Sequence, residues 1–160
     1  MSAVITEAQC LQIGMVTLIV SLFFYVGRTL NRAIWIRELG FAFLGVSSVA
    51  LIASLALRSV SAQYFALSNM YESMLVLIIW MQIAFLVIDR WFKTVGLGWP
   101  VCLLMLVALI YDTTLPTTIA PLQAALQSYW RSIHVPVIIL SYAMFALSFI
   151  SSLVYLAQSY

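Results

Sequence analysis

Charged side chains are scarce in this sequence. Only 8% of the 160 residues are Asp, Glu, Lys or Arg, whereas an average soluble domain carries about 25%. Hydrophobic residues make up 65% of the chain, and this composition indicates an integral membrane protein. The net charge is only +2 and no basic run occurs, so nothing in the charge pattern suggests a nucleic-acid partner.

Residue types that bind metals or perform catalysis are also few. The chain has one histidine, His134, and therefore cannot by itself hold a haem between two histidines. Its two cysteines, Cys10 and Cys102, lie in apolar stretches and form no CxxC pair, so we interpret them as small packing residues. Because the sequence contains no Gly-rich phosphate loop, no HExxH motif and no Ser–His–Asp set, no catalytic residue is predicted.

Long apolar stretches are abundant. A helix that crosses a bilayer needs about 20 mainly apolar residues, and five stretches qualify. They are residues 8–27, 39–57, 70–88, 94–111 and 133–158. We therefore expect an all-α fold, a polytopic transmembrane helix bundle of five spans that forms a single domain over residues 1–160.

The basic residues between these stretches predict an orientation. The loops after the first and third spans hold five of them, Arg28, Arg32, Arg37, Arg90 and Lys93. The opposite loops hold only Arg58 and Arg131. Since short cytoplasmic loops are enriched in Lys and Arg, we expect the N-terminus outside and the C-terminus on the cytoplasmic or stromal side. The membrane would be a bacterial inner membrane or a thylakoid membrane.

The segment "PLQAALQSYWRSI" predicts a short amphipathic helix at about residues 121–132. Pro121 suits a first helical position. Leu122, Leu126 and Tyr129 recur at three- and four-residue spacing, which is typical of a helix that lies along a membrane surface. Pro136 disfavours helical geometry at the residue before it, so we expect a kink or break just after His134.

His134 would then lie at the outer interface, where the surface helix meets the fifth span. Trp130 and Arg131 precede it by four and three residues and can share its face. Neutral imidazole is a good ligand for iron, and an aromatic ring and a cation suit a flat, anionic porphyrin. The alternative interpretation is an ordinary interfacial belt of aromatic and basic residues.

A second motif, "LSNMYESM", lies at the start of the third span. Asn69 followed by Glu72 resembles a capping box, in which polar side chains satisfy the first amides of a helix. A carboxylate there is also favoured by the helix dipole. One interpretation is a well-capped helix. The other is an outer-face site in which Tyr71 and Glu72, with Asn69, order a partner or a bound ligand.

The two motifs together resemble the CcsA/ResC family of cytochrome c biogenesis proteins. The resemblance rests on "YFALSNMYESMLVLIIW" and, about fifty residues later, "PLQAALQSYWRSIHVPVIILSYAMFALSFISSLVYL". It implies that His134 is an axial ligand of transiently bound haem b on the outer side, flanked by Trp130 and Arg131. It also implies that the protein promotes thioether bonds between haem vinyl groups and apocytochrome c, together with a membrane partner of the CcsB/ResB type.

Two elements of the family pattern do not occur in these 160 residues. They are the tryptophan-rich outer loop, called the WWD region, and a second outer histidine after it. We therefore expect the chain to correspond to the N-terminal portion of such a protein. It would work with a C-terminal portion that carries the WWD region and the second axial ligand, and it would not be an active synthase alone. The alternative function is a structural or accessory subunit of a larger membrane complex without haem.

Overall fold

The computed structural model describes residues 6–31, 33–93, 96–119 and 128–159, and this part of the chain consists of five α-helices without a β-strand. The helices are α1 (Glu7–Leu30), α2 (Ile34–Ala62), α3 (Met70–Phe92), α4 (Gly98–Asp112) and α5 (Arg131–Ser159). The all-helical fold class expected from composition is therefore confirmed.

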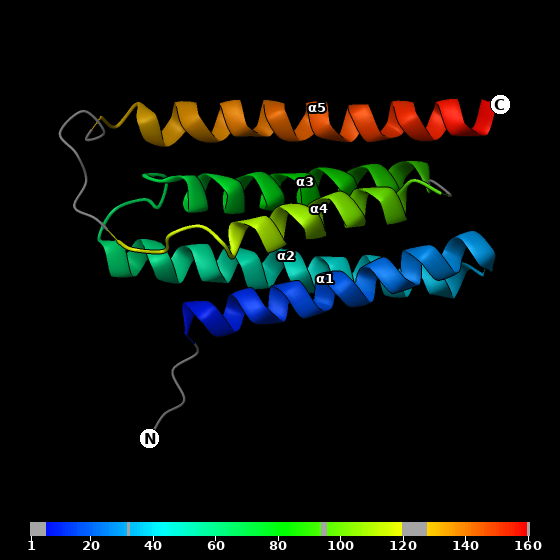
Figure 1. The fold of residues 1–160 in the computed structure, drawn as a ribbon, viewed down its shortest axis with the longest axis horizontal. Coiled ribbons are helices and arrows are strands. Elements are labelled where there is room, and N and C mark those ends of the chain that lie inside the picture. Colours follow the sequence, from blue (N-terminus) through cyan, green and yellow to red (C-terminus); the bar gives the residue numbers. More distant parts are fainter. Residues whose placement is uncertain (1–5, 32, 94–95, 120–127, 160) are drawn as a thin grey trace, which may run out of the picture.

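The five helices run roughly along one long axis, and successive helices are antiparallel (Figure 1). α1 and α2 pack against each other most extensively, α3 and α4 lie between that pair and α5, and α5 contacts mainly α3. One end of the bundle therefore collects the start of α1, the segment 63–69, the segment 113–119 and the start of α5. We call this the Arg58 end, after the buried arginine of α2 that lies there, and the opposite end the Arg37 end.

Four helices are long and apolar enough to cross a membrane, namely α1, α2, α3 and α5. The predicted fourth span is shorter than expected, because α4 has 15 residues and a length of only about 22 Å against a hydrocarbon core of about 30 Å. α4 begins only at Gly98, inside the predicted stretch 94–111, and ends at Asp112, one residue beyond it.

α2 extends beyond the predicted stretch 39–57 at both ends. It includes Glu38 and also Arg37 and Arg58, which were expected to lie in the loops on either side of the span. The two arginines remain helical and buried because carboxylates of neighbouring helices pair with them, as described below. Charge alone therefore misplaced these helix ends.

The predicted break after His134 is wrong. α5 runs without interruption from Arg131 through Pro136 to Ser159. The proline lacks the amide that would bond the Ser132 carbonyl, and because it lies in the second turn, the helix loses this one backbone bond close to its start. The His134 amide, donating to the Trp130 carbonyl at 2.9 Å, holds the first turn.

The predicted surface helix falls mostly on residues 120–127, which lie outside the described residues. Its last part is not a separate helix. Tyr129 and Trp130 form a turn, and Arg131 and Ser132 are the first residues of α5.

α1 and α2 approach each other closely at small residues of both helices. The Ser47 hydroxyl donates to the Gly14 carbonyl at 2.8 Å, and the Ser21 hydroxyl donates to the Gly40 carbonyl at 2.8 Å. Such side chain-to-backbone bonds between helices require short interhelical distances. Cys10 and Cys102 are free and buried within the bundle, in agreement with a packing role.

Candidate functional site

Asn69 caps the N-terminus of α3. Its side-chain oxygen accepts a hydrogen bond from the Glu72 amide at 2.9 Å, which is the first half of the expected capping box. The second half differs from the standard motif. The Glu72 carboxylate bonds the Asn69 side-chain amide at 3.3 Å and accepts from the backbone amide of Ser68 at 2.6 Å.

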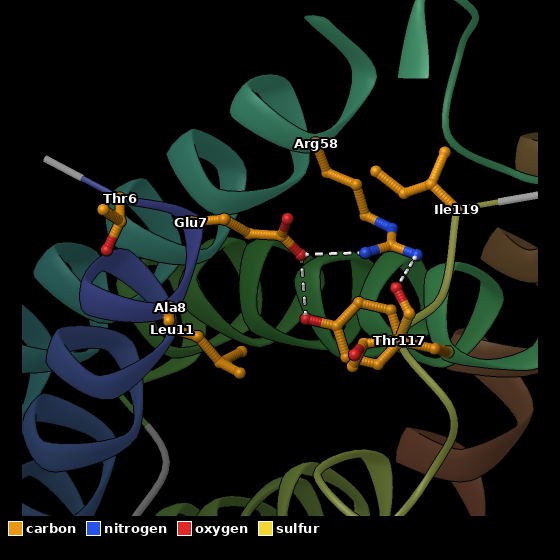
Figure 2. Close-up of a pocket in the computed structure, with 8 residues that line it drawn as sticks. Thr6, Glu7, Ala8, Leu11, Arg58, Thr117 and Ile119 are labelled. Atoms are coloured by element: carbon orange, nitrogen blue, oxygen red, sulfur yellow. Dashed lines mark hydrogen bonds and ion pairs between the residues drawn. The ribbon is translucent and has the colours of Figure 1, made fainter. Parts of the chain in front are cut away.

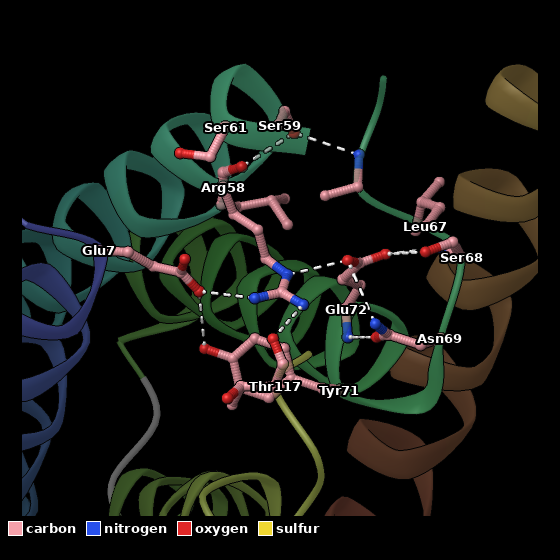
Figure 3. Close-up of polar contacts among 12 residues, drawn as sticks. Glu7, Arg58, Ser59, Ser61, Leu67, Ser68, Asn69, Tyr71, Glu72 and Thr117 are labelled. Carbon is pink, nitrogen blue, oxygen red and sulfur yellow. Dashed lines mark hydrogen bonds and ion pairs between the residues drawn. The ribbon is translucent and has the colours of Figure 1, made fainter. Parts of the chain in front are cut away.

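A buried arginine of α2 organises this end of the bundle. Arg58 is 1% exposed, and its Nε donates to Oε1 of the fully buried Glu72 at 2.8 Å (Figure 3). Its Nη1 donates to Oε1 of Glu7 in α1 at 3.1 Å, and its Nη2 donates to the Thr117 carbonyl at 3.0 Å. The guanidinium also lies over the ring of Tyr71, 4.7 Å from the centroid. One side chain thus joins α1, α2, α3 and the segment after α4.

We call Glu7, Arg58, Tyr71, Glu72 and Thr117 the Arg58 cluster. Tyr71 completes it by donating from its hydroxyl to the Glu7 carboxylate at 3.3 Å. All members of the cluster except Glu72 line a cavity of about 400 Å³, which Thr6, Leu11 and Ile119 also line (Figure 2). Because the carboxylates of the cluster already bond the guanidinium or the tyrosine, its geometry suits holding helices together rather than acid–base catalysis.

A comparable cluster lies at the Arg37 end. Arg37 is 3% exposed, and its Nε lies 3.1 Å from Oδ2 of the fully buried Asp89 in α3. The Tyr25 hydroxyl of α1 donates to the same carboxylate oxygen at 3.1 Å. Each end of the bundle therefore has a buried arginine of α2 paired with a buried carboxylate of α3.

The first turn of α5 carries the predicted histidine on the surface. His134 is exposed, and its imidazole stacks on the indole of Trp130 with centroids 5.8 Å apart and planes 19° apart. Trp130 itself is 64% exposed. The stacking fixes the orientation of the imidazole without enclosing it, so the ring remains accessible from outside the bundle.

Arg131 attaches this turn to the rest of the protein. Its Nη1 donates to the Leu67 carbonyl at 2.8 Å, which ties the start of α5 to the segment before α3. Its Nε is buried and has no hydrogen-bond partner among the described residues. A buried donor without an acceptor is costly and rare.

An apolar groove of about 390 Å³ lies between α3 and α5. α3 contributes Met70 and Met74 to its lining, and α5 contributes Val135, Ile138 and Tyr142. Val135 directly follows His134 in the chain, so the groove lies next to the turn that carries the imidazole.

The predicted site residues thus form two groups at the same end of the bundle. Tyr71 and Glu72 are buried beneath Asn69, whereas Trp130 and His134 are exposed at the start of α5. Arg131 joins the groups through Leu67. Within the described residues, no group of three or more His, Cys, Asp or Glu side chains could hold a metal ion.

Sequence reasoning missed the central role of Arg58. It was interpreted only as a basic residue of the loop after the second span, where it served to predict the orientation. One local signal could have found the pair of Arg58 and Glu72. A cation at the end of an apolar helix, followed by an acidic residue near the start of the next helix, indicates a buried ion pair. The contacts with Glu7 and Thr117 join residues 51 and 59 positions away, and no local pattern predicts them.

These features define an integral membrane protein with a polar cluster and an exposed histidine at one end of the bundle. The family model described as cytochrome C assembly protein matches residues 67–160. The chain therefore belongs to the cytochrome c assembly protein family, as the resemblance of its two motifs suggested.

Curated relatives agree with this assignment. The chain is 31% identical over 135 residues to a cytochrome c biogenesis protein CcsA of Gloeothece citriformis, a match that covers 81% of this chain and 40% of the relative. It is 37% identical over 125 residues to CcsA of Chlorella vulgaris, covering 75% and 39%. The chain thus spans about two fifths of the length of these relatives. No solved structure matches it significantly.

Proposed function

We propose that this chain takes part in the maturation of c-type cytochromes and that it binds haem on the extracytoplasmic side of the membrane, with His134 as one axial ligand of the iron. The observation that carries the proposal is the exposed imidazole of the only histidine, held in one orientation by Trp130. Family membership supplies the biological context, since the curated relatives are cytochrome c biogenesis proteins.

The residues around His134 fit a haem. The neutral imidazole offers a nitrogen to iron, and the apolar groove beside Val135 suits the apolar edge of a porphyrin. The unpaired Nε of Arg131 is a donor that a propionate carboxylate would satisfy after a small movement of the side chain. Trp130 offers a flat aromatic surface next to the imidazole.

Each residue has a separate task in this proposal. His134 binds the iron, Trp130 keeps the imidazole plane fixed, and Arg131 orients the anionic edge. Haem supplies the vinyl groups that form thioether bonds with the cysteines of apocytochrome c. Asn69, Tyr71 and Glu72 lie beneath this surface and order it. No catalytic residue is assigned to this chain.

We further propose that the Arg58 end faces the extracytoplasmic side of a bacterial inner membrane or a thylakoid membrane. The distribution of Lys and Arg supports this orientation, because most of them flank the Arg37 end. The partners would be a CcsB/ResB-type membrane protein, apocytochrome c and a portion that carries a WWD region and the second axial ligand.

Haem binding can be tested by titrating the purified chain with haemin in detergent and recording the Soret band. The parent should form a band characteristic of imidazole-ligated haem, and His134→Ala should lose that band, because the chain has no second histidine. Tyr155→Ala is the matched control, since Tyr155 is a 72% exposed aromatic residue far from His134 on the same helix. Equal spectra for the parent and His134→Ala would refute the ligand assignment.

A structural subunit without haem remains the competing function. The broad apolar surface of α5 would suit it, because α5 exposes Phe145, Phe149 and Tyr155 among other large side chains. A parent chain with no Soret band at all, co-purifying with a respiratory or photosynthetic complex, would support that function instead.

A further inference from the structure

One peptide group connects the buried Arg58 cluster to the exposed histidine turn. The carbonyl of Leu67 and the amide of Ser68 belong to the same planar peptide unit. The amide donates to Oε2 of Glu72 at 2.6 Å, and the carbonyl accepts from Nη1 of Arg131 at 2.8 Å. The buried carboxylate and the α5 arginine thus hold opposite sides of a single rigid group.

The charges at the two sides of this peptide reinforce each other. The Glu72 carboxylate forms an ion pair with Arg58 at 2.8 Å, and its charge polarises the Ser68 amide that it binds. The polarised peptide presents a more negative carbonyl oxygen to the Arg131 guanidinium. Hydrogen bonds in such a chain strengthen one another, particularly where water is excluded. Glu72 is fully buried and Leu67 is 5% exposed, so this condition is met.

We propose that Glu72 and Arg58 are positioning residues for the haem ligand, because they fix the Leu67–Ser68 peptide that holds Arg131 and, with it, the turn of Trp130 and His134. The inference rests on the proposed role of His134 for its functional meaning. The connection itself consists of contacts that exist without haem. Neither Glu72 nor Arg58 touches the imidazole, so both act through the peptide and Arg131.

The segment that carries this peptide has further supports, which confine its movement. The Ala66 amide donates to the Ser59 hydroxyl at 3.2 Å, and the Ser68 hydroxyl donates to Glu72 at 2.9 Å. Figure 3 shows Ser59, Ser68 and Asn69 around the path from Arg58 to Leu67. These polar supports come from α2 and α3, and Arg131 provides the hydrogen bond that joins the segment to the first turn of α5. Val135 and Ile139 of α5 also pack against Leu67.

The single histidine makes the proposal measurable without haem. Protein labelled with ¹⁵N and ¹³C only in histidine gives one set of imidazole resonances. Because the indole of Trp130 stacks on the ring at 5.8 Å, its ring current displaces these resonances. The difference between the parent and Trp130→Leu measures that displacement and therefore reports whether the turn keeps its geometry.

Glu72→Gln tests the connection, and Asp89→Asn is its matched control. Both changes replace a fully buried carboxylate, paired with a buried arginine of α2, by the amide of the same shape. Of these two carboxylates, Glu72 bonds the Leu67–Ser68 peptide and Asp89 does not. We expect the ring-current displacement to be largely lost in Glu72→Gln and retained in Asp89→Asn. Ser68→Ala removes the hydroxyl bonds to Glu72 and Tyr64 and keeps both charges, and it should reduce the displacement if Glu72→Gln does not fold.

Two results would overturn the proposal. The first is a ring-current displacement that stays unchanged in Glu72→Gln while the melting temperature falls, which would mean a purely structural role for Glu72. Ser68→Ala is judged in the same way if Glu72→Gln does not fold. The second is an equal loss in the Asp89→Asn control, which would mean general loosening of the bundle.

Haemin affinity separates this inference from the proposed function. Glu72→Gln should weaken binding about 10-fold, the effect typical of removing a group that orients a metal ligand, and Asp89→Asn should not. If His134→Ala binds haemin as tightly as the parent, the proposed function fails, whereas the imidazole resonances still decide whether Glu72 positions the turn.

Discussion

Arg58 carries a positive charge at a position that is 1% exposed, and its surroundings decide whether that charge is tolerated. Two carboxylates, a carbonyl oxygen and the face of Tyr71 surround the guanidinium. A buried ion pair contributes little net stability compared with well-packed apolar residues, but removal of one partner leaves an uncompensated charge. The main effect of the cluster is therefore to specify which helix ends meet, and its contribution to the net stability of the fold is smaller.

This asymmetry predicts the behaviour of single and double variants. Arg58→Met should destabilise the protein by about 3–5 kcal/mol, since Glu72 would remain buried without its cation. The double variant Arg58→Met/Glu72→Leu should recover much of that loss. Thermal unfolding in detergent, followed by circular dichroism, measures both. A double variant that is less stable than the single one would contradict this account.

The pair of Arg37 with Glu38 provides the comparison. Glu38 has a side chain that is 50% exposed, so water screens the pair and Glu38→Gln should change stability by at most about 1 kcal/mol.

At the scale of the helix, the start of α3 depends on Asn69 and the start of α5 on Arg131. Both helices begin next to the segment 63–69. Asn69 satisfies an amide of α3 from within that segment, and Arg131 reaches back to the Leu67 carbonyl. The segment 63–69 therefore sets where two helices begin, although it lies between α2 and α3 and is not helical itself.

Asn69→Ala should remove the cap of α3 and cost about 1 kcal/mol, because the Glu72 amide would lose its acceptor. Asn69→Ser can still cap the helix and should cost less. Hydrogen exchange of the first-turn amides of α3 measures the local effect, which should be faster exchange in the alanine variant only. Equal exchange in the parent and in Asn69→Ala would indicate that the cap is not needed.

At the scale of the molecule, α5 is the least enclosed helix. Half of the most apolar window of α3 is buried, compared with 17% of that of α5. α5 contacts mainly α3, and its first turn is held by Arg131. The helix that carries the proposed haem ligand is therefore attached along one side only, which leaves the opposite side for lipid or for another protein surface.

The proposed orientation can be checked by cysteine labelling. Gln63→Cys lies at the Arg58 end and Lys93→Cys at the Arg37 end, and both positions are exposed. A membrane-impermeant maleimide should label Gln63→Cys in intact spheroplasts and Lys93→Cys only after permeabilisation. The native Cys10 and Cys102 are buried, so the background should be low. The reverse labelling pattern would place the histidine turn in the cytoplasm and remove the basis for the proposed function.

Local sequence patterns predicted the helical class, the cap at Asn69 and the family motifs. They succeeded because hydrophobic run length, capping chemistry and residue spacing are properties of short segments. They failed at Pro136, where a local rule predicted a break, because the hydrogen bond to Trp130 and the anchor at Leu67 hold the first turn in a helix.

The amino-acid sequence alone determined that the chain enters a membrane as helices and where its single imidazole stands along the chain, since both follow from composition and order. Only the tertiary structure decided that Arg58 gathers Glu7, Glu72 and Thr117, and that one peptide joins Glu72 to Arg131. The physical reason is that a charge in a low-dielectric interior must find its partners in space, and these partners lie on different helices.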